Sequence, residues 1–275
     1  MPRPVKGAGQ LIRARGWSAG HANGREGLLE VRDAVIRFGG VAAVDGASIT
    51  APPGSITGLI GPNGAGKTTL FNLVAGALRP AAGEIRFEGR PLTRLPAQAR
   101  LAVGLARTFQ IPRPFPELTV LENLMVAAPP GAMLAAALAP GRTRARELAA
   151  RARAEEILAR LALTRLSGEP ARVLSGGQRK LLELGRVLMA RPRMILLDEP
   201  AAGVNPALLE AIGQHLTALR DEGVGLLMVE HNMGFVSGLC DRVYAMESGR
   251  IIAEGTAAEV LADPRVAASY LGAAA

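Results

Sequence analysis

A glycine-rich loop that ends in a lysine and a hydroxyl residue is the strongest chemical signal in the chain. It reads Gly61-Pro62-Asn63-Gly64-Ala65-Gly66-Lys67-Thr68, followed by Thr69. Glycines let the backbone turn so that successive N–H groups converge on phosphate oxygens. The lysine would neutralise the β- and γ-phosphates of a nucleotide, and the Thr68 hydroxyl is a suitable Mg²⁺ ligand. The loop lies between a predicted strand and a predicted helix, which weighs against the alternative of a chance glycine turn.

Two adjacent carboxylates, Asp198 and Glu199, follow the apolar run 194–197. Open α/β sheets bind their ligands at the carboxyl ends of strands. Successive side chains of a strand point in opposite directions, so the two acids need not share one role. Asp198 fits a Mg²⁺-binding acid acting through water, and Glu199 fits the base that polarises an attacking water. The alternative is a pair of solvated acids at a strand end, and the preceding phosphate loop argues against it.

Composition bounds the class of protein. The chain has 275 residues, with 49% apolar residues and 3% aromatics, so its core must be built from aliphatic side chains. Such a core suits helices packed on a buried parallel sheet. The net charge of +8 is carried mostly by arginine. It indicates either an anionic partner surface or, with the abundance of Ala and Gly, a GC-rich genome, and the second interpretation is favoured.

Cysteine content and hydropathy exclude several classes. Cys240 is the only cysteine, which rules out an intrachain disulfide and argues against a cysteine-based zinc site. The basic, Gly-rich segment 1–27 lacks the apolar core of a signal peptide and is predicted to be a disordered tail. No run of about 18 apolar residues is present, so no membrane span is expected. The protein is predicted to be cytosolic, with attachment to a membrane only through a partner.

Periodicity predicts one α/β domain over 28–275, with a helical segment inserted at about 111–175. The expected strands cover 28–38, 41–49, 55–60, 83–89, 105–109, 194–197, 224–229, 243–246 and 251–253. The first two are expected to be antiparallel. The expected helices cover 68–77, 97–103, 118–127, 144–162, 178–189, 206–221 and 232–239, with short helices at the end of the chain. The charged side of 144–162 is interpreted as a solvated helix face.

Residues 174–178 complete a recognisable set of motifs. They read Leu174-Ser175-Gly176-Gly177-Gln178, and they lie between the phosphate loop and the Leu-Leu-Asp-Glu-Pro segment that ends at residue 200. In this order the three motifs resemble the nucleotide-binding domain of ABC ATPases, from about residue 28 to the end. The resemblance implies an α/β fold: a P-loop NTPase (RecA-like) core with an antiparallel β subdomain and an inserted α-helical subdomain. It also implies ATP hydrolysis coupled to transmembrane transport, with ATP and Mg²⁺ as cofactors.

The same resemblance assigns further residues. Gln110 stands where the family has its Mg²⁺-sensing glutamine, and His231 where it has a histidine that contacts the γ-phosphate. Phe38 corresponds to an aromatic ring that stacks on adenine, although a core or surface phenylalanine is the alternative. Ser175, Gly176, Gly177 and Gln178 would close on the ATP held by a second subunit. Asn205 replaces the usual aspartate, which puts one expected contact across the dimer in doubt.

Finer similarities indicate the branch of the family. The segments 107–110, 116–124, 199–206 and 263–272 resemble the ATP-binding subunits of branched-chain amino acid importers. Related systems for urea or short amides and for lipopolysaccharide export are the alternatives. A soluble ABC ATPase that acts on nucleic acid or ribosomes is disfavoured, because tandem domains, long coiled coils and zinc modules are lacking. A catalytically inactive copy is disfavoured by the joint presence of Lys67, Glu199 and His231.

The assembly implied by the resemblance contains several other chains. A second ABC ATPase subunit is expected, with a heterodimer preferred over a homodimer. Two transmembrane permease subunits and, indirectly, a periplasmic solute-binding protein complete it, and no specific nucleic acid is expected. The ATPase would lie peripherally on the cytoplasmic face of the inner membrane.

Overall fold

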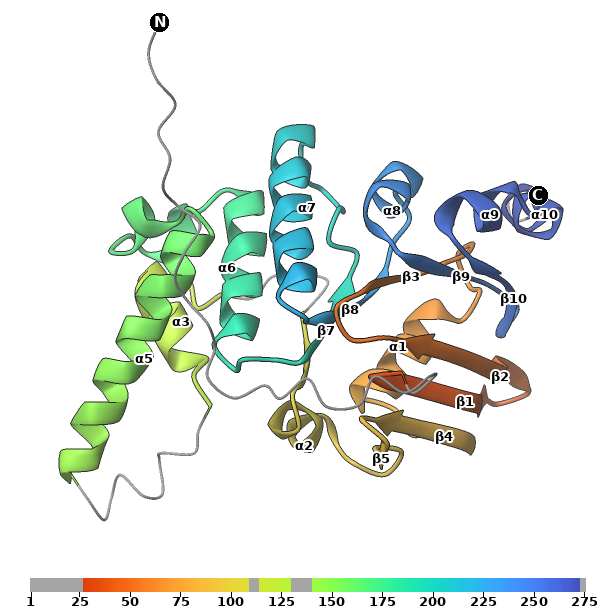
Figure 1. Ribbon diagram of the computed structural model, residues 1–275, viewed down its shortest axis with the longest axis horizontal. Helices are drawn as coiled ribbons and strands as arrows, with labels where there is room; N and C mark the ends of the chain where they lie inside the picture. The colour runs from red at the N-terminus through yellow and green to blue at the C-terminus, as the bar shows by residue number, and fades with distance from the viewer. Residues whose placement is uncertain (1–26, 109–113, 130–139, 273–275) are drawn as a thin grey trace, which may run out of the picture.

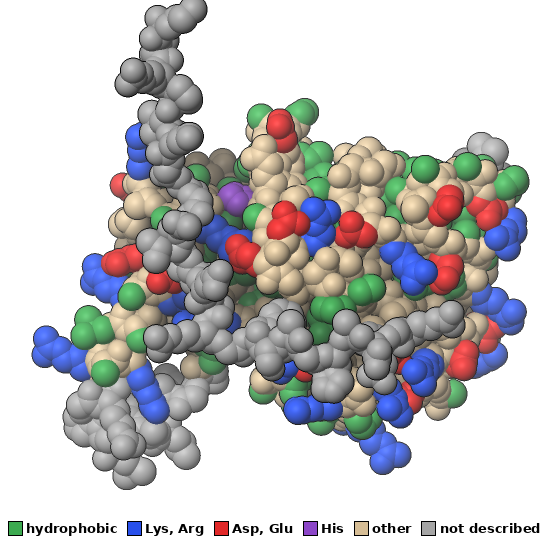
Figure 2. Space-filling model, viewed as in Figure 1, with side chains coloured by type: hydrophobic (Ala, Val, Ile, Leu, Met, Phe, Trp, Pro, Cys, Tyr) green, Lys and Arg blue, Asp and Glu red, His purple; other side chains and the backbone are tan. Residues whose placement is uncertain are grey.

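A computed structural model describes residues 27–108, 114–129 and 140–272. All but the last residue of the predicted tail 1–27 lies outside the described residues, and so does Gln110. Two sheets and the helices around them make up this part of the chain (Figure 1). On the face drawn in Figure 2, Lys and Arg side chains are interspersed with Asp and Glu side chains.

The larger sheet has six strands in the order β10-β9-β3-β8-β7-β6. Its parallel strands are β3 (Ile56–Ile60), β6 (Leu105–Arg107), β7 (Met194–Asp198), β8 (Gly225–Val229) and β9 (Arg242–Glu247), and β10 (Arg250–Gly255) runs antiparallel to β9. Every residue of β3, β7 and β8 is buried, as expected for parallel strands covered on both faces. The carboxyl ends of these strands meet along one edge, which is where the chemical motifs begin.

A second, antiparallel sheet has the order β2-β1-β4-β5. It consists of β1 (Leu29–Phe38), β2 (Val41–Ala51), β4 (Ala82–Phe87) and the short β5 (Arg90–Pro91). The predicted antiparallel pairing of the first two strands is confirmed. The Tyr244 hydroxyl of β9 joins the two sheets, since it accepts from Thr50 N at 3.1 Å and donates to Thr50 O at 3.3 Å.

Helices cover the six-stranded sheet and extend beyond it. Helices α6 (Gly176–Leu188), α7 (Pro206–Asp221) and α8 (Met233–Leu239) stand side by side along it, while α3 (Val120–Val126) and α5 (Pro140–Arg160) lie beyond α6 (Figure 1). Helix α1 (Lys67–Ala75) shares a core with the antiparallel sheet. The remaining helices are α2 (Ala97–Ala102), η1 (Thr164–Leu166), η2 (Ala171–Val173), α9 (Ala257–Ala262) and α10 (Pro264–Gly272). Among the described helices, none is long and apolar enough to cross a bilayer.

Local capping explains two differences from the predicted boundaries. Helix α1 ends at residue 75 rather than 77, because Gly76 adopts a left-handed conformation with φ 81° and terminates the helix. Helix α3 starts at residue 120 rather than 118, because Thr119 and Glu122 form a reciprocal capping box. The charged side of α5 is exposed as predicted, with Arg151 and Glu155 paired at 3.0 Å.

Candidate nucleotide-binding site

The phosphate loop leaves the carboxyl end of β3 and enters α1 through two glycines that have no room for a side chain. Gly61 has φ 146°, and a Cβ there would lie 2.1 Å from the carbonyl oxygen of Met246. Gly66 has φ 101°, and a Cβ would lie 2.2 Å from the carbonyl oxygen of Ala43. Gly66 is also the N-cap of α1 and provides no side-chain hydrogen bond to it. The first N–H groups of α1 thus have no side-chain cap, which suits a phosphate ligand.

A cavity of about 460 Å³ lies over this loop. The loop contributes Asn63, Gly64, Ala65, Gly66, Lys67, Thr68 and Thr69 to the lining. The other walls come from distant parts of the chain, namely Val41, Ala42, Ala43, Glu199, His231 and Ser248. The fold therefore brings the predicted phosphate loop, base and histidine to one cavity.

The side chain of Lys67 is buried at the base of the loop. Its Nζ donates to the carbonyl oxygens of Gly61 at 2.7 Å and Pro62 at 2.8 Å. Burial lowers the pKa of Lys67, and the nearby Glu199 carboxylate acts in the opposite direction. Pro62 and Gly61 contribute to the site through these carbonyl groups.

The two adjacent acids diverge, as the alternation of a strand predicted. Asp198 is buried, and its Oδ2 accepts from Nη2 of Arg107 at 3.0 Å. Glu199 Oε1 lies 3.1 Å from Nε2 of His231. Glu199 has a φ of 49°, a left-handed conformation that is uncommon for a residue with a side chain. Asp198 therefore faces Arg107, while Glu199 faces the histidine in the wall of the cavity.

Residues 175–178 begin α6 and do not belong to the lining of this cavity. Ser175 Oγ accepts from Gln178 N at 3.3 Å, and Gln178 Oε1 accepts from Ser175 N at 2.9 Å. A Cβ on Gly177 would lie 1.4 Å from Cδ2 of Leu208, so α6 approaches α7 closely there. The two polar side chains thus cap the helix, and the structure does not bring this segment to the chain's own phosphate loop.

The structure places Phe38 and Asn205, two further residues singled out in the sequence, but does not describe a third, Gln110. Phe38 is 51% exposed at the end of β1 and pairs with Val41, which lines the cavity. Asn205 is the N-cap of α7, where its Oδ1 accepts from Leu208 N at 2.9 Å. Gln110 lies outside the described residues, so its predicted role remains a prediction.

Comparison with known proteins decides the family. A family model described as "ABC transporter" matches residues 44–202, more than half of the chain. The chain belongs to the ABC transporter family. A second model, described as "Branched-chain amino acid ATP-binding cassette transporter", matches residues 250–275 of this ABC ATPase.

Curated relatives cover nearly the whole ABC ATPase. A probable branched-chain amino acid transport ATP-binding protein LivG of Methanocaldococcus jannaschii is 40% identical, over 89% of this chain and 97% of its own length. BraF of Pseudomonas aeruginosa, a high-affinity branched-chain amino acid transport ATP-binding protein, is 37% identical, over 89% and 98% respectively. The family predicted from the motifs is confirmed, and with it an ATP-binding, ATP-hydrolysing subunit of a transporter.

Solved structures confirm the predicted fold class of this ABC ATPase. A nucleotide-free ATP-binding cassette from an ABC transporter aligns with a TM-score of 0.76 and 38% identity, covering 87% of this chain and 97% of that one. An ATP-binding cassette in its ADP conformation aligns with a TM-score of 0.78 and 37% identity, covering 90% of this chain and 100% of that one.

The donor set of the ABC ATPase fits Mg²⁺. Among the described residues, no group of three or more His, Cys, Asp or Glu side chains could hold a metal ion. Mg²⁺ does not need such a cage, since it binds through one or two protein oxygens together with substrate phosphates and water. Thr68 of the phosphate loop and Asp198 at the end of β7 offer hard oxygen ligands of this kind.

Sequence reasoning missed three residues that organise the site. Arg107 drew attention only as part of a family segment, although it binds Asp198. Lys180 is a lysine in a chain whose basic residues are mostly arginine, and Glu230 is an acid at the end of an apolar strand. An acid at the end of an apolar strand is the same signal that identified Asp198, and it would have identified Glu230 as well. Nothing in the sequence pattern indicates what Lys180 binds.

Proposed function

We propose that this ABC ATPase powers the uptake of branched-chain amino acids across an inner membrane. The family model that matches residues 250–275 and the names of the relatives support this cargo over urea, short amides or exported lipopolysaccharide. The subunit would lie peripherally on the cytoplasmic face, bound to two transmembrane permeases that receive solute from a periplasmic binding protein. The match to the ABC transporter family over residues 44–202 and the transport names of the relatives support a transporter over a nucleic-acid ATPase.

One observation supports the chemistry best: Glu199 and His231 meet at 3.1 Å in the wall of the cavity that lies over the phosphate loop. In the proposed mechanism Glu199 orients and polarises the water that attacks the γ-phosphate, and His231 orients Glu199 and contacts the phosphate. Lys67 exchanges its loop carbonyls for phosphate oxygens and offsets their charge. Phe38 would stack on adenine at the edge of the cavity.

Thr68, Asp198 and Gln110 would hold Mg²⁺ in this proposal. The ion would supply positive charge to the β- and γ-phosphates. Asp198 is suited to a water-mediated contact, because its Oδ2 is already engaged by Arg107 at 3.0 Å. Arg107 thereby orients the carboxylate before any metal is bound.

The proposed active unit is a pair of ATPase subunits. Residues 175–178 are not part of the chain's own cavity lining, which supports the expectation that they cover the ATP of a second subunit. A heterodimer is proposed, with a homodimer as the alternative. Residues 28–275 would form the ABC ATPase domain, and the helical subdomain at about 111–175 would transmit closure to the permeases.

Radiolabelled uptake tests this function in cells whose only copy of the ATPase carries Glu199→Gln. Loss of leucine, isoleucine and valine uptake is expected, with uptake of urea and an unrelated sugar unchanged. Glu155→Gln, which removes an exposed carboxylate on α5, is the matched control and should transport normally. Intact uptake of the three amino acids by the Glu199→Gln cells would contradict the proposed cargo.

A further inference from the structure

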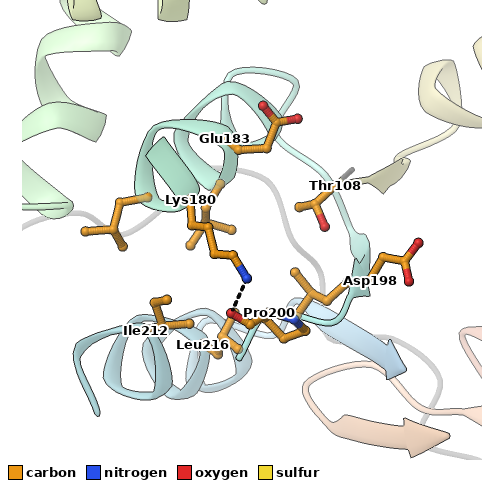
Figure 3. A pocket seen from close by; sticks show the side chains of 10 residues that line it. Thr108, Lys180, Glu183, Asp198, Pro200, Ile212 and Leu216 are labelled. Atoms are coloured by element: carbon orange, nitrogen blue, oxygen red, sulfur yellow. Dashed lines mark hydrogen bonds between the residues drawn. The ribbon is translucent and has the colours of Figure 1, made fainter. Parts of the chain in front are cut away.

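The ammonium group of Lys180 is bound entirely to the loop that follows Glu199. Its Nζ donates to the carbonyl oxygens of Glu199 at 3.1 Å, Pro200 at 3.1 Å and Ala202 at 2.5 Å. Figure 3 shows the side chain reaching from α6 across a small cavity to Pro200. A lysine has three N–H donors, so these three carbonyls use all of them. Lys180 therefore holds this loop rather than a solvent-facing anion.

A buried carboxylate holds the same loop by a different backbone group. Glu230 is 2% exposed, and its Oε1 accepts from Ala201 N at 2.6 Å. Its Oε2 accepts from His231 N at 2.8 Å and from Asn232 N at 3.0 Å. Hydrogen bonds from backbone N–H groups to a buried carboxylate are charge-assisted and strong. Glu230 thus ties the loop after Glu199 to the turn that carries His231.

The two charges together hold every residue of the loop 199–202 by one backbone group. Lys180 binds the carbonyl oxygens of Glu199, Pro200 and Ala202, Glu230 binds the N–H of Ala201, and the opposite charges of the two side chains attract each other. This matters because Glu199 has a φ of 49°. A left-handed conformation is unfavourable for a residue with a side chain and persists only where its surroundings impose it. Without the two charged groups, we expect the loop to relax and the Glu199 side chain to turn away from His231.

We propose that Lys180 and Glu230 form a clamp, defined by these two side chains on the loop 199–202, that positions Glu199 for ATP hydrolysis. This positioning role rests on the proposed function of Glu199 as the base. The clamp also links two parts of the composite site. Lys180 lies on α6, the helix that starts with the 175–178 segment, so displacement of α6 by a partner's nucleotide would move the chain's own base.

Kinetics of the assembled transporter test the clamp through Lys180→Met and Glu230→Gln. Arg151→Met and Glu155→Gln are matched controls, since they remove one charge each from an exposed pair on α5. The clamp variants should lower kcat by about 10- to 100-fold, because small displacements of a catalytic group have effects of this size. KM and the affinity for a fluorescent ATP analogue should stay within about twofold, as the phosphate loop is untouched. Lys180→Arg should recover part of kcat, because it keeps the charge with a different donor geometry.

Combining Lys180→Met with Glu199→Gln separates a positioning role of Lys180 from a general loss of structure. If Lys180 acts through Glu199, adding Lys180→Met to Glu199→Gln should cause no further loss in single-turnover hydrolysis. A full additional loss would overturn the proposal, as would wild-type kcat in Lys180→Met or an equal fall in kcat and nucleotide affinity. Lys180→Arg and Glu230→Gln carry the test if Lys180→Met does not fold. Normal hydrolysis by Glu199→Gln alone would instead refute the proposed base, so the two failures are distinguishable.

Discussion

Arg107 Nη2 donates to Asp198 Oδ2 at 3.0 Å, while Nη1 of the same guanidinium donates to Asn72 Oδ1 at 2.6 Å. The guanidinium also lies over the ring of Phe71, 4.8 Å from its centroid. One side chain at the end of β6 therefore joins the acid at the end of β7 to the helix that follows the phosphate loop. Because Asp198 is buried, loss of the arginine would leave an uncompensated carboxylate in the interior, which costs more than the loss of a surface pair.

Replacing Arg107 with methionine should destabilise the fold. The change leaves a buried carboxylate without its charged partner and Asn72 without a donor, at a cost of about 2 kcal/mol or more. Urea unfolding at neutral pH measures the loss. Arg151→Met, at an exposed ion pair, should change stability by less than about 0.5 kcal/mol. Equal stability of the two variants would contradict the structural role of Arg107.

Lys67→Ala should weaken ATP binding by at least about tenfold, since it removes the cation that offsets phosphate charge. Titration calorimetry with ATP gives the affinity directly. Arg179→Ala is a useful comparison, because this residue is an exposed cation whose side chain is outside the cavity lining. An unchanged affinity for ATP in Lys67→Ala would refute the role assigned to the lysine.

Asn205 should be replaceable by aspartate without loss of stability, because either side chain accepts the hydrogen bond from Leu208 N. Alanine lacks the acceptor and should cost about 1 kcal/mol. Thermal unfolding of the two variants provides the measurement. If Asn205→Ala were as stable as the parent, the capping explanation for this residue would be wrong.

Cys240 should be nearly unreactive in the native protein. Burial raises the pKa of its thiol to about 12, with Asp241 and Glu230 adding to the effect, so the thiolate is scarce at pH 8. Alkylation by iodoacetamide at pH 8 should be about a thousandfold slower than in the unfolded chain. The folded thiol keeps its proton between pH 9 and 12 while the unfolded thiol loses it, so this group lowers stability as pH rises through that window. Rapid alkylation of the folded protein would contradict the assigned pKa.

Elements with strong local signals could be predicted from the sequence. The apolar runs of β3 and β7 and the helix over 206–221 were predicted because burial on both faces of a strand and a proline at the first helical position leave clear patterns. The two-residue strand β5 was not predicted, since its pairing with β4 depends on the partner and not on its own residues.

In the candidate site, too, some residues could be predicted from local sequence and others depend on tertiary packing. The phosphate loop and the pair Asp198 and Glu199 are contiguous in the sequence and follow apolar strands, so their chemistry could be inferred locally. Lys180 was missed because its three acceptors are backbone carbonyls about twenty residues away, and a carbonyl has no sequence signature. Only the packing of α6 beside β7 brings them together.

Phosphate release by the assembled transporter carrying Glu199→Gln tests the central claim most directly, with ATP affinity measured in the same preparation. The account predicts that ATP binds as tightly as in the parent while kcat falls by at least about 100-fold, because the base is lost and the phosphate loop is intact. Steady-state phosphate release at the parent rate would contradict the assignment of Glu199, and with it the mechanism built on the contact between Glu199 and His231.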